Sequence, residues 1–348
     1  MIAAKARRVP RLSVNPVLER ELRQRLRGRA AWVSLTLYLV VLGLLLRLVY
    51  DVVADSQNFF GGQFQQASTA GRSIFHWLLF VMLGLICFIV PGLTASSVAG
   101  ERERQTLVPL QITLLSARSI VVGKLLASLA FVVLLVLAAL PFLSVSFLLG
   151  GVSLAEVLKG TAMVLAVAVA VAALSLACSS LVRRTQTATV TAYGLVGMLV
   201  VGTVVVYTAQ RAFDRSVTGT TKPTVLVLNP FAATAEVVRG RTDGFNLTSP
   251  FEGIQELLES EVFLEEDGFG EFAPVPLPPG AIGPEGAIRI IEGPPGVVQQ
   301  QFAEEGRRPR VWGMPFWAAS LLSFAVVTGV SLAIAVRRVR VPVRGRSE

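Results

Sequence analysis

The sequence predicts an all-α membrane protein with six transmembrane helices, an N-terminal interfacial amphipathic helix and a large extracytoplasmic loop between helices five and six. Two observations support this fold class. Hydrophobic residues make up 53% of the 348 residues. They are concentrated in long apolar runs, each reaching the roughly 18–20 residues that a helical bilayer crossing needs. Arginines also cluster at alternate ends of these runs, as expected for a membrane protein with one fixed orientation.

The N-terminal region, residues 1–31, is predicted to be cytoplasmic and to contain an amphipathic helix. Asn15-Pro16 is a helix-start signal, with proline in the first turn. Leucines then recur every four residues among many charged ones, which is typical of a helix lying along lipid headgroups. An ordinary solvated basic helix is the alternative. The residues that carry the interfacial prediction are Leu18, Leu22, Leu26, Arg23 and Arg27.

Six apolar segments are long enough to span a membrane. The predicted spans are Trp32–Val49, Ile74–Ala99, Ile120–Leu149, Val157–Val182, Ala188–Tyr207 and Met314–Val336. Transmembrane helices one to five therefore occupy residues 32–208, the sixth occupies 314–336, and a basic tail covers 337–348. The positive-inside rule places the arginine-rich segments, both termini and the connection 100–119 in the cytoplasm. Residues 51–73 form a predicted outer loop.

The largest predicted outer loop, residues 209–313, carries more acidic than basic residues. Within it, residues 224–238 are apolar but too short to cross as a simple helix, and Asn229-Pro230 interrupts them. A re-entrant or interfacial hairpin is therefore predicted there. Residues 251–264 have the pattern of a short amphipathic helix.

Several functions are disfavoured by the residues present. The net charge of +9 comes largely from arginines that flank apolar runs without interleaved aromatic residues, so no nucleic-acid partner is predicted. Cys87 and Cys178 lie inside apolar runs and imply neither a disulfide framework nor a metal site. Gly123-Lys124 lacks the glycine loop of an ATP-binding motif. We therefore expect no catalytic site, cofactor or metal in this chain.

Ionisable groups inside the membrane are also scarce. No Asp, Glu or His lies deep inside a predicted span, which argues against a membrane-embedded enzyme or an ion-coupled carrier. The single histidine, His76, lies beside Trp77 at the outer start of the second predicted span, a position typical of the interfacial aromatic belt.

The connection 100–119 carries the clearest functional signal. A charged head opens it, and leucines with helical spacing follow, so a short amphipathic element is predicted at the cytoplasmic surface. Because this element is fixed to two spans, a force applied to it would tilt both. A solvated charged loop that caps a helix is the alternative. The candidate residues are Glu101, Arg102, Glu103, Arg104, Thr106 and Leu107.

The order of these motifs resembles that of the ABC-2 type permeases, the membrane subunits of ATP-driven exporters. In that family the second span is followed by Glu-(Lys/Arg)-Glu-x-Gly-Thr-Leu, then by a Thr-Pro-Leu-Ser-like turn and a Gly-Lys pair. The family's glycine is Gln105 here and its proline is Leu114. Asn229-Pro230-Phe231 is similar to the segment after the fifth span, where the family forms an outward-facing hairpin. The matching positions are Glu101, Arg102, Glu103, Thr106, Leu107, Thr113, Leu115, Ser116, Gly123 and Lys124.

This resemblance implies that residues 100–119 form a coupling helix that docks in a groove of a separate ATPase subunit, which holds ATP and Mg. It implies a second permease copy or a paralogue as partner, and export of an unknown substrate. The Ala, Val, Leu and Arg bias suggests a bacterium with a GC-rich genome, and hence the inner membrane. The alternative is a non-transporting membrane scaffold whose outer loop binds an envelope partner.

Overall fold

The computed structural model describes residues 29–57, 63–105, 116–214, 223–238, 249–259 and 310–339. Six helical segments within these ranges are long and apolar enough to cross a membrane. They are Trp32–Val52, Ala70–Glu103, Ala117–Leu148, Leu154–Leu181, Thr185–Phe213 and Phe316–Val339. Each overlaps one predicted span, so the prediction of an all-α membrane protein with six spans is confirmed.

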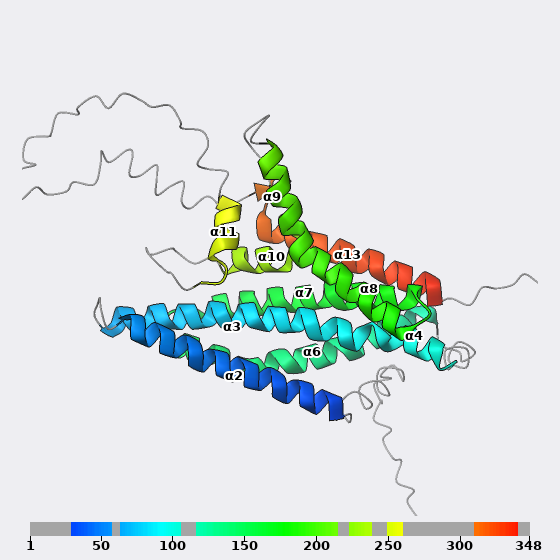
Figure 1. Ribbon diagram of the computed structural model, residues 1–348, viewed down its shortest axis with the longest axis horizontal. Coiled ribbons are helices and arrows are strands. Elements are labelled where there is room, and N and C mark those ends of the chain that lie inside the picture. Colours follow the sequence, from blue (N-terminus) through cyan, green and yellow to red (C-terminus); the bar gives the residue numbers. More distant parts are fainter. Residues whose placement is uncertain are drawn as a thin grey trace, which may run out of the picture.

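The elements follow one another along the chain with short connections where the structure describes them (Figure 1). The second span consists of α3 and α4, and the fifth of α8, a π-helical segment η1, and α9. The elements are α2 (Arg29–Gln57), α3 (Gln63–Thr94), α4 (Ser96–Glu103), α6 (Ala117–Leu148), α7 (Leu154–Leu181), α8 (Thr185–Gly197), η1 (Met198–Gly202), α9 (Thr203–Asp214), the 3₁₀ turn η2 (Leu226–Leu228), α10 (Pro230–Val237), α11 (Glu252–Glu259), β1 (Arg310–Val311), β2 (Met314–Pro315) and α13 (Phe316–Val339).

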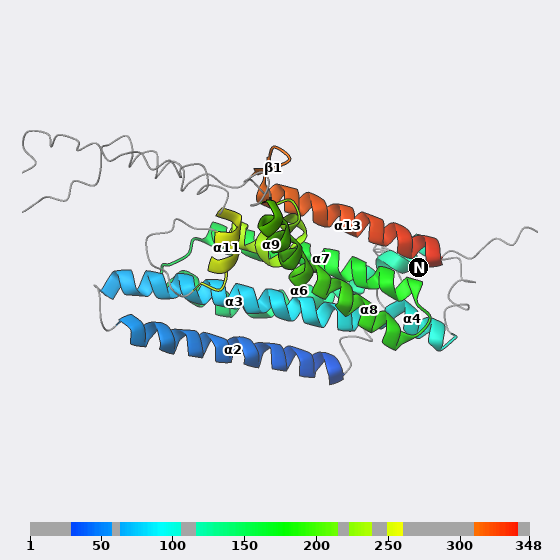
Figure 2. The same ribbon diagram turned by 45° about the horizontal axis from the view of Figure 1, so that its top comes forward.

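Helix α7 lies at the centre of the bundle and contacts α3, α6, α8, α10 and α13. Its buried face is rich in alanine and serine, whose small side chains allow neighbouring helices to approach closely. Helix α2, in contrast, packs against α3 and α6 and exposes large apolar side chains on its other face. The views in Figures 1 and 2 both place α2 at the edge of the bundle.

The alternating direction of the spans brings the basic residues together at one end. Helix α4 ends, α6 begins, α7 ends, α8 begins and α13 ends at the right of Figure 1. We call this end of the bundle the basic end. Its cationic residues include Arg102, Arg104, Arg118, Arg183, Arg184, Arg337 and Arg338.

At the opposite end, the predicted loop 51–73 is largely helical. Helix α2 extends to Gln57 and α3 begins at Gln63. The bounds of the predicted loop lie where the apolar runs of the two neighbouring spans end. A helix can continue past the end of an apolar run, because its backbone hydrogen bonds are satisfied internally. Hydropathy alone therefore makes the loop too long at both ends.

The turn between α6 and α7 contacts α3 very closely. A Cβ atom built on Gly151 would lie 2.0 Å from the carbonyl oxygen of Ser68 and 2.5 Å from the backbone nitrogen of Arg72. Arg72 Nε donates to the carbonyl of Gly151 at 3.3 Å. Ser153 and Glu156 then form a capping box that starts α7. Glycine at position 151 is therefore required by the approach of two backbones.

The apolar segment 224–238 does not form a crossing helix. It folds as η2 and α10, separated at Asn229, whose side chain caps α10, while proline occupies the first helical position. Helix α10 packs against α7 and α13. Its re-entry into the membrane stays a prediction. The expected amphipathic helix 251–264 is present in shorter form as α11.

His76 lies near the start of the second span, and its interfacial position stays a prediction. Its side chain is 8% exposed and lies beside the rings of Phe75 and Phe251. Phe251 directly precedes α11, so a segment distant in the sequence covers the histidine.

Some predictions concern residues outside the described ranges. They are the interfacial helix with Leu18, Leu22, Leu26, Arg23 and Arg27, the residues Thr106 and Leu107 with the rest of 106–115, most of 239–309, and the tail beyond residue 339.

Candidate functional site

The candidate site lies at the basic end, where the second span changes direction. Pro91 in α3 has no N–H to donate to the carbonyl of residue 87, which weakens the helix at that point. Tyr193 of α8 donates its hydroxyl to the carbonyl of Phe88 at 2.9 Å. A Cβ atom on Gly92 would lie 2.8 Å from the Tyr193 hydroxyl oxygen. Glycine at position 92 therefore leaves the room that Tyr193 of α8 needs to bind the backbone of the second span.

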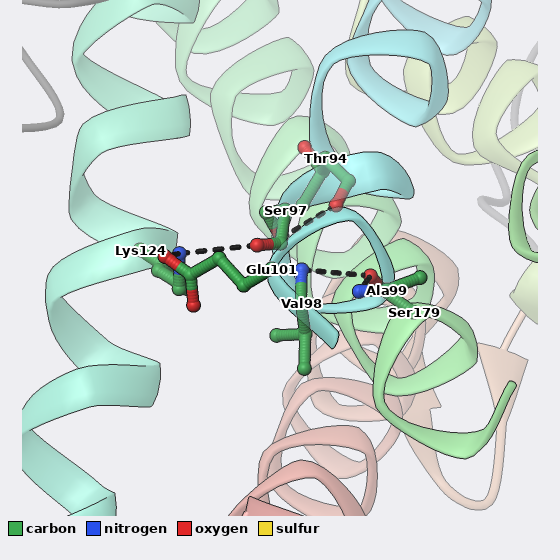
Figure 3. Close-up of polar contacts among 7 residues, drawn as sticks. All are labelled: Thr94, Ser97, Val98, Ala99, Glu101, Lys124 and Ser179. Atoms are coloured by element: carbon green, nitrogen blue, oxygen red, sulfur yellow. Dashed lines mark hydrogen bonds and ion pairs between the residues drawn. The ribbon is translucent and has the colours of Figure 1, made fainter. Parts of the chain in front are cut away.

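Lys124 ties α4 to α6. Its side chain is 1% exposed, and Nζ lies 2.8 Å from Oε1 of Glu101 and 3.1 Å from the carbonyl oxygen of Ser97 (Figure 3). Burying an ammonium group without a partner costs several kcal/mol, at about the level of a whole protein's stability. Glu101 and the Ser97 carbonyl offset that cost, so the position of α4 is fixed by a buried charge on α6.

Ser179 of α7 holds α4 from another side. The backbone N–H groups of Val98 and Ala99 both donate to Ser179 Oγ at 3.0 Å (Figure 3). The first four N–H groups of a helix have no partner within the helix. The residue preceding α4 is Ala95, which provides no side-chain cap. Ser179 therefore supplies the N-terminal cap of α4 from a different helix.

The other two charged residues of α4 contact the connection between α7 and α8. Arg102 Nη1 donates to the carbonyls of Ser180 and Val182 at 3.1 and 3.5 Å. A cation is favourable there because carbonyls at a helix C-terminus carry partial negative charge. Glu103 Oε2 accepts from the backbone N–H and the hydroxyl of Thr185 at the start of α8. A carboxylate is favourable at this helix N-terminus for the opposite reason.

We call these residues of α4 and their partners the α4 cluster. It connects α4 to α6, α7 and α8 at once. The cluster comprises Ser97, Val98, Ala99, Glu101, Arg102 and Glu103 of α4 together with Lys124, Ser179, Ser180, Val182 and Thr185.

The charged head is part of the second span rather than a separate surface element. Glu101, Arg102 and Glu103 all make contacts within the chain, whereas Arg104 is exposed. Sequence reasoning gave no role to Ser179 or Thr185. Lys124 offered a signal, because it is a cation close behind the start of an apolar run.

Helix α4 ends in a backbone conformation that favours glycine. Gln105 has φ of 56°, and its N–H donates to the carbonyl of Arg102 at 3.2 Å. Residues just after a helix C-terminus often adopt this left-handed conformation, and glycine does so without a Cβ clash. The position occupied by glycine in the family motif is therefore the position that needs one here.

Replacing Gln105 with glycine is expected to stabilise the protein by about 1 kcal/mol, because the left-handed conformation costs a side-chain-bearing residue roughly that amount. Thermal unfolding in detergent micelles measures the change. Arg104→Gly is the matched control, since Arg104 has φ of −82° and gains nothing from glycine. A lower unfolding temperature for Gln105→Gly than for the wild type would contradict this assignment.

Comparison with known proteins adds one finding to this geometry. Residues 15–267 match the family described as ABC-2 family transporter protein. The matched region includes the first five spans, the α4 cluster, α10 and α11. A search of curated proteins found no match.

Proposed function

The chain belongs to the ABC-2 transporter family, and from that membership we propose that it is the permease subunit of an exporter powered by a separate ATPase subunit. It is a multi-pass membrane protein with six candidate spans. In this proposal the ATPase holds ATP and Mg, and two permeases, identical or paralogous, form the pathway in a bacterial inner membrane.

The basic end faces the cytoplasm in this proposal. Arginines lie directly after α4, in the first turn of α6, between α7 and α8, and in the last turn of α13. The excess of positive charge thus recurs at several independent connections on this side. Cytoplasmic segments of membrane proteins carry this excess of Lys and Arg. Both chain termini would then be cytoplasmic, and the loop between spans five and six would lie outside, with α10 entering the bundle from that side.

The observation that carries the proposal is the simultaneous connection of α4 to three other helices. An ATPase that pushed on the segment after α4 would displace a short helix whose charges are paired to α6, α7 and α8. Since packed helices move as units rather than bending continuously, the displacement would pass to the spans. ATP-driven closure of two ATPase subunits would thereby switch the paired permeases between inward-facing and outward-facing or closed states.

This arrangement divides the predicted coupling residues into two groups. Glu101, Arg102 and Glu103 are positioning residues that hold α4 to the bundle. Arg104, which is exposed, and the segment that follows it, with Thr106 and Leu107, would contact the ATPase directly. Substitutions in the first group should therefore uncouple movement from ATP hydrolysis, whereas substitutions in the second should weaken ATPase binding.

Photo-crosslinking tests the proposal. A benzophenone maleimide is attached to Arg104→Cys and, as the matched control, to Ala155→Cys, which is exposed near the start of α7 at the opposite end. Cys87 and Cys178 are buried and react slowly with such reagents. We expect Arg104→Cys to form a covalent adduct with a co-expressed protein that carries the Gly-x-x-x-x-Gly-Lys-Ser/Thr motif, and Ala155→Cys to form none.

Two outcomes would overturn the proposal. One is that no ATP-binding protein copurifies with the chain or crosslinks at Arg104→Cys. The other is that a membrane-impermeant maleimide applied to intact cells labels Arg104→Cys and spares Ala155→Cys. The second result would place the α4 cluster outside, where a cytosolic ATPase has no access.

A further inference from the structure

A second set of polar contacts joins the fifth span to α10. Asn229 is 1% exposed and uses both ends of its amide. Nδ2 donates to the carbonyl of Val200 and to Oγ1 of Thr203, both at 2.8 Å. Oδ1 accepts from the backbone N–H groups of Phe231 and Ala232 at 2.8 and 3.1 Å. An asparagine amide offers two donors and one oxygen with two lone pairs, so its full capacity is used.

Asn229 contacts the fifth span where the helix is irregular. In η1 the N–H of Thr203 donates to the carbonyl of Met198, five residues earlier, instead of to that of Leu199. The carbonyl of Leu199 accepts from the Thr203 hydroxyl at 2.7 Å. A π-helical turn is rare, and it is frequently found at functional sites. The hydroxyl of Thr203 thus donates to the carbonyl of Leu199 within the irregular helix and accepts from Asn229.

The two contacts of the Asn229 amide, with α10 and with the fifth span, need different chemical groups at this position. Capping α10 needs only a side-chain oxygen, which Asp or Ser would supply equally well. Donation to Val200 and Thr203 needs the NH₂ group, which these residues lack. Since the donors contact the π-helical turn, the choice of asparagine over other caps is explained by the connection to the fifth span.

The π-helical turn could convert to an α-helical one, which would give the fifth span a second, discrete conformation. It holds one residue more than an α-helical turn, so conversion to α-helix would rotate α9 by about 100° relative to α8. The fifth span begins at the first residue of α8, Thr185, which is bonded to Glu103 of the α4 cluster. The fifth span therefore links the α4 cluster at the basic end with Asn229 and α10 near the middle of the span.

We propose that Asn229 is a positioning residue that locks the π-helical turn of the fifth span to α10, so that a displacement of α8 at the α4 cluster moves α10. The lock itself is a property of this chain alone. The displacement that it transmits rests on the proposed function.

Hydrogen–deuterium exchange of the full chain in lipid nanodiscs tests the lock without any partner. Asn229→Asp keeps the oxygen that caps α10 and removes both donors. We expect amide exchange around residues 198–203 to accelerate about tenfold, because those amides lose a stabilising contact. The amides of Phe231 and Ala232 should stay as protected as in the wild type. Exchange around 198–203 within twofold of the wild type would overturn the proposal.

Two further variants guard against a general loss of structure. Thr203→Val removes the acceptor while leaving Asn229 in place, and should accelerate the same amides about fivefold. Thr189→Val is the matched control, since Thr189 Oγ1 makes a similar bond to the carbonyl of Thr185 but lies in α8, before the π-helical turn. Equal acceleration in Thr189→Val and Thr203→Val would also overturn the lock.

The transmitting role is tested in the complex with the ATPase, with and without ATP and vanadate. In the wild type we expect nucleotide to change exchange both at the start of α8 and in α10. Asn229→Asp should keep the change at α8 and lose the change at α10. An unchanged nucleotide response of α10 in this variant would overturn the role. A wild type that binds no ATPase would instead overturn the proposed function, and the exchange of the isolated chain would still decide the lock.

Discussion

Replacing Lys124 with methionine is expected to lower the free energy of unfolding by about 3 kcal/mol. Methionine fills a similar volume, so the loss comes from the charge rather than from a cavity. Glu101 and the Ser97 carbonyl would lose the cation that lies 2.8 and 3.1 Å from them. Removing one partner of a buried pair typically costs about 3–5 kcal/mol, and the expected loss lies at the lower end of that range.

Denaturant titration in mixed micelles measures this loss, and two variants isolate its cause. Arg118→Met removes an exposed cation from the same helix and should change stability by less than about 1 kcal/mol. The double variant Glu101→Gln with Lys124→Met should recover most of the loss, because no uncompensated charge is left. If Lys124→Met proved as stable as Arg118→Met, the buried pair would not hold α4 to α6.

The six spans could be predicted because a bilayer constrains each segment separately. Length and hydrophobicity identify a crossing, and flanking arginines give its direction, so no knowledge of packing is needed. Span ends were less accurate for the same reason. Helices α2 and α3 continue beyond the apolar residues, to Gln57 and from Gln63, where hydrophobicity no longer distinguishes helix from loop.

The α4 cluster could be predicted only in part. The charged head is visible as a local run of charged residues, but its partners on α7 and α8 lie about 80 residues away along the chain, as in the bonds of Ser179 to Val98 and Ala99. No local pattern distinguishes Ser179 from the other serines of α7. A serine becomes a helix cap only when tertiary packing brings an uncapped helix start beside it.

Asn229 shows a similar division. The Asn229-Pro230 pair predicts an interruption of the apolar segment, and in the structure α10 begins directly after Asn229. The bonds from its side-chain amide to Val200 and Thr203 depend on the π-helical turn η1. The glycines at 197 and 202 are not a sequence signal specific to such a turn. The cover of His76 could not be predicted for a related reason, since Phe251 belongs to a distant segment. The predicted interfacial helix with Leu18, Leu22 and Leu26 stays a prediction.

The second large effect is expected at Gly151, where alanine should destabilise the protein by about 3 kcal/mol or more. The new Cβ atom would lie 2.0 Å from the Ser68 carbonyl oxygen and 2.5 Å from the Arg72 backbone nitrogen. A flexible side chain could move away, but both of these atoms belong to the backbone of α3. Helix α3 must therefore separate from the α6–α7 turn, and the bond from Arg72 Nε to the Gly151 carbonyl would be strained or lost.

Gly150→Ala provides the matched control, because its cost has a different origin. Gly150 has φ of 81°, yet a Cβ atom there meets nothing within 4 Å. Alanine at 150 should therefore cost only the backbone strain of about 1 kcal/mol. Thermal unfolding of the two variants in the same detergent separates steric collision from backbone strain. If Gly150→Ala proved the more damaging, the close approach of α3 to the α6–α7 turn would not be what requires glycine at position 151.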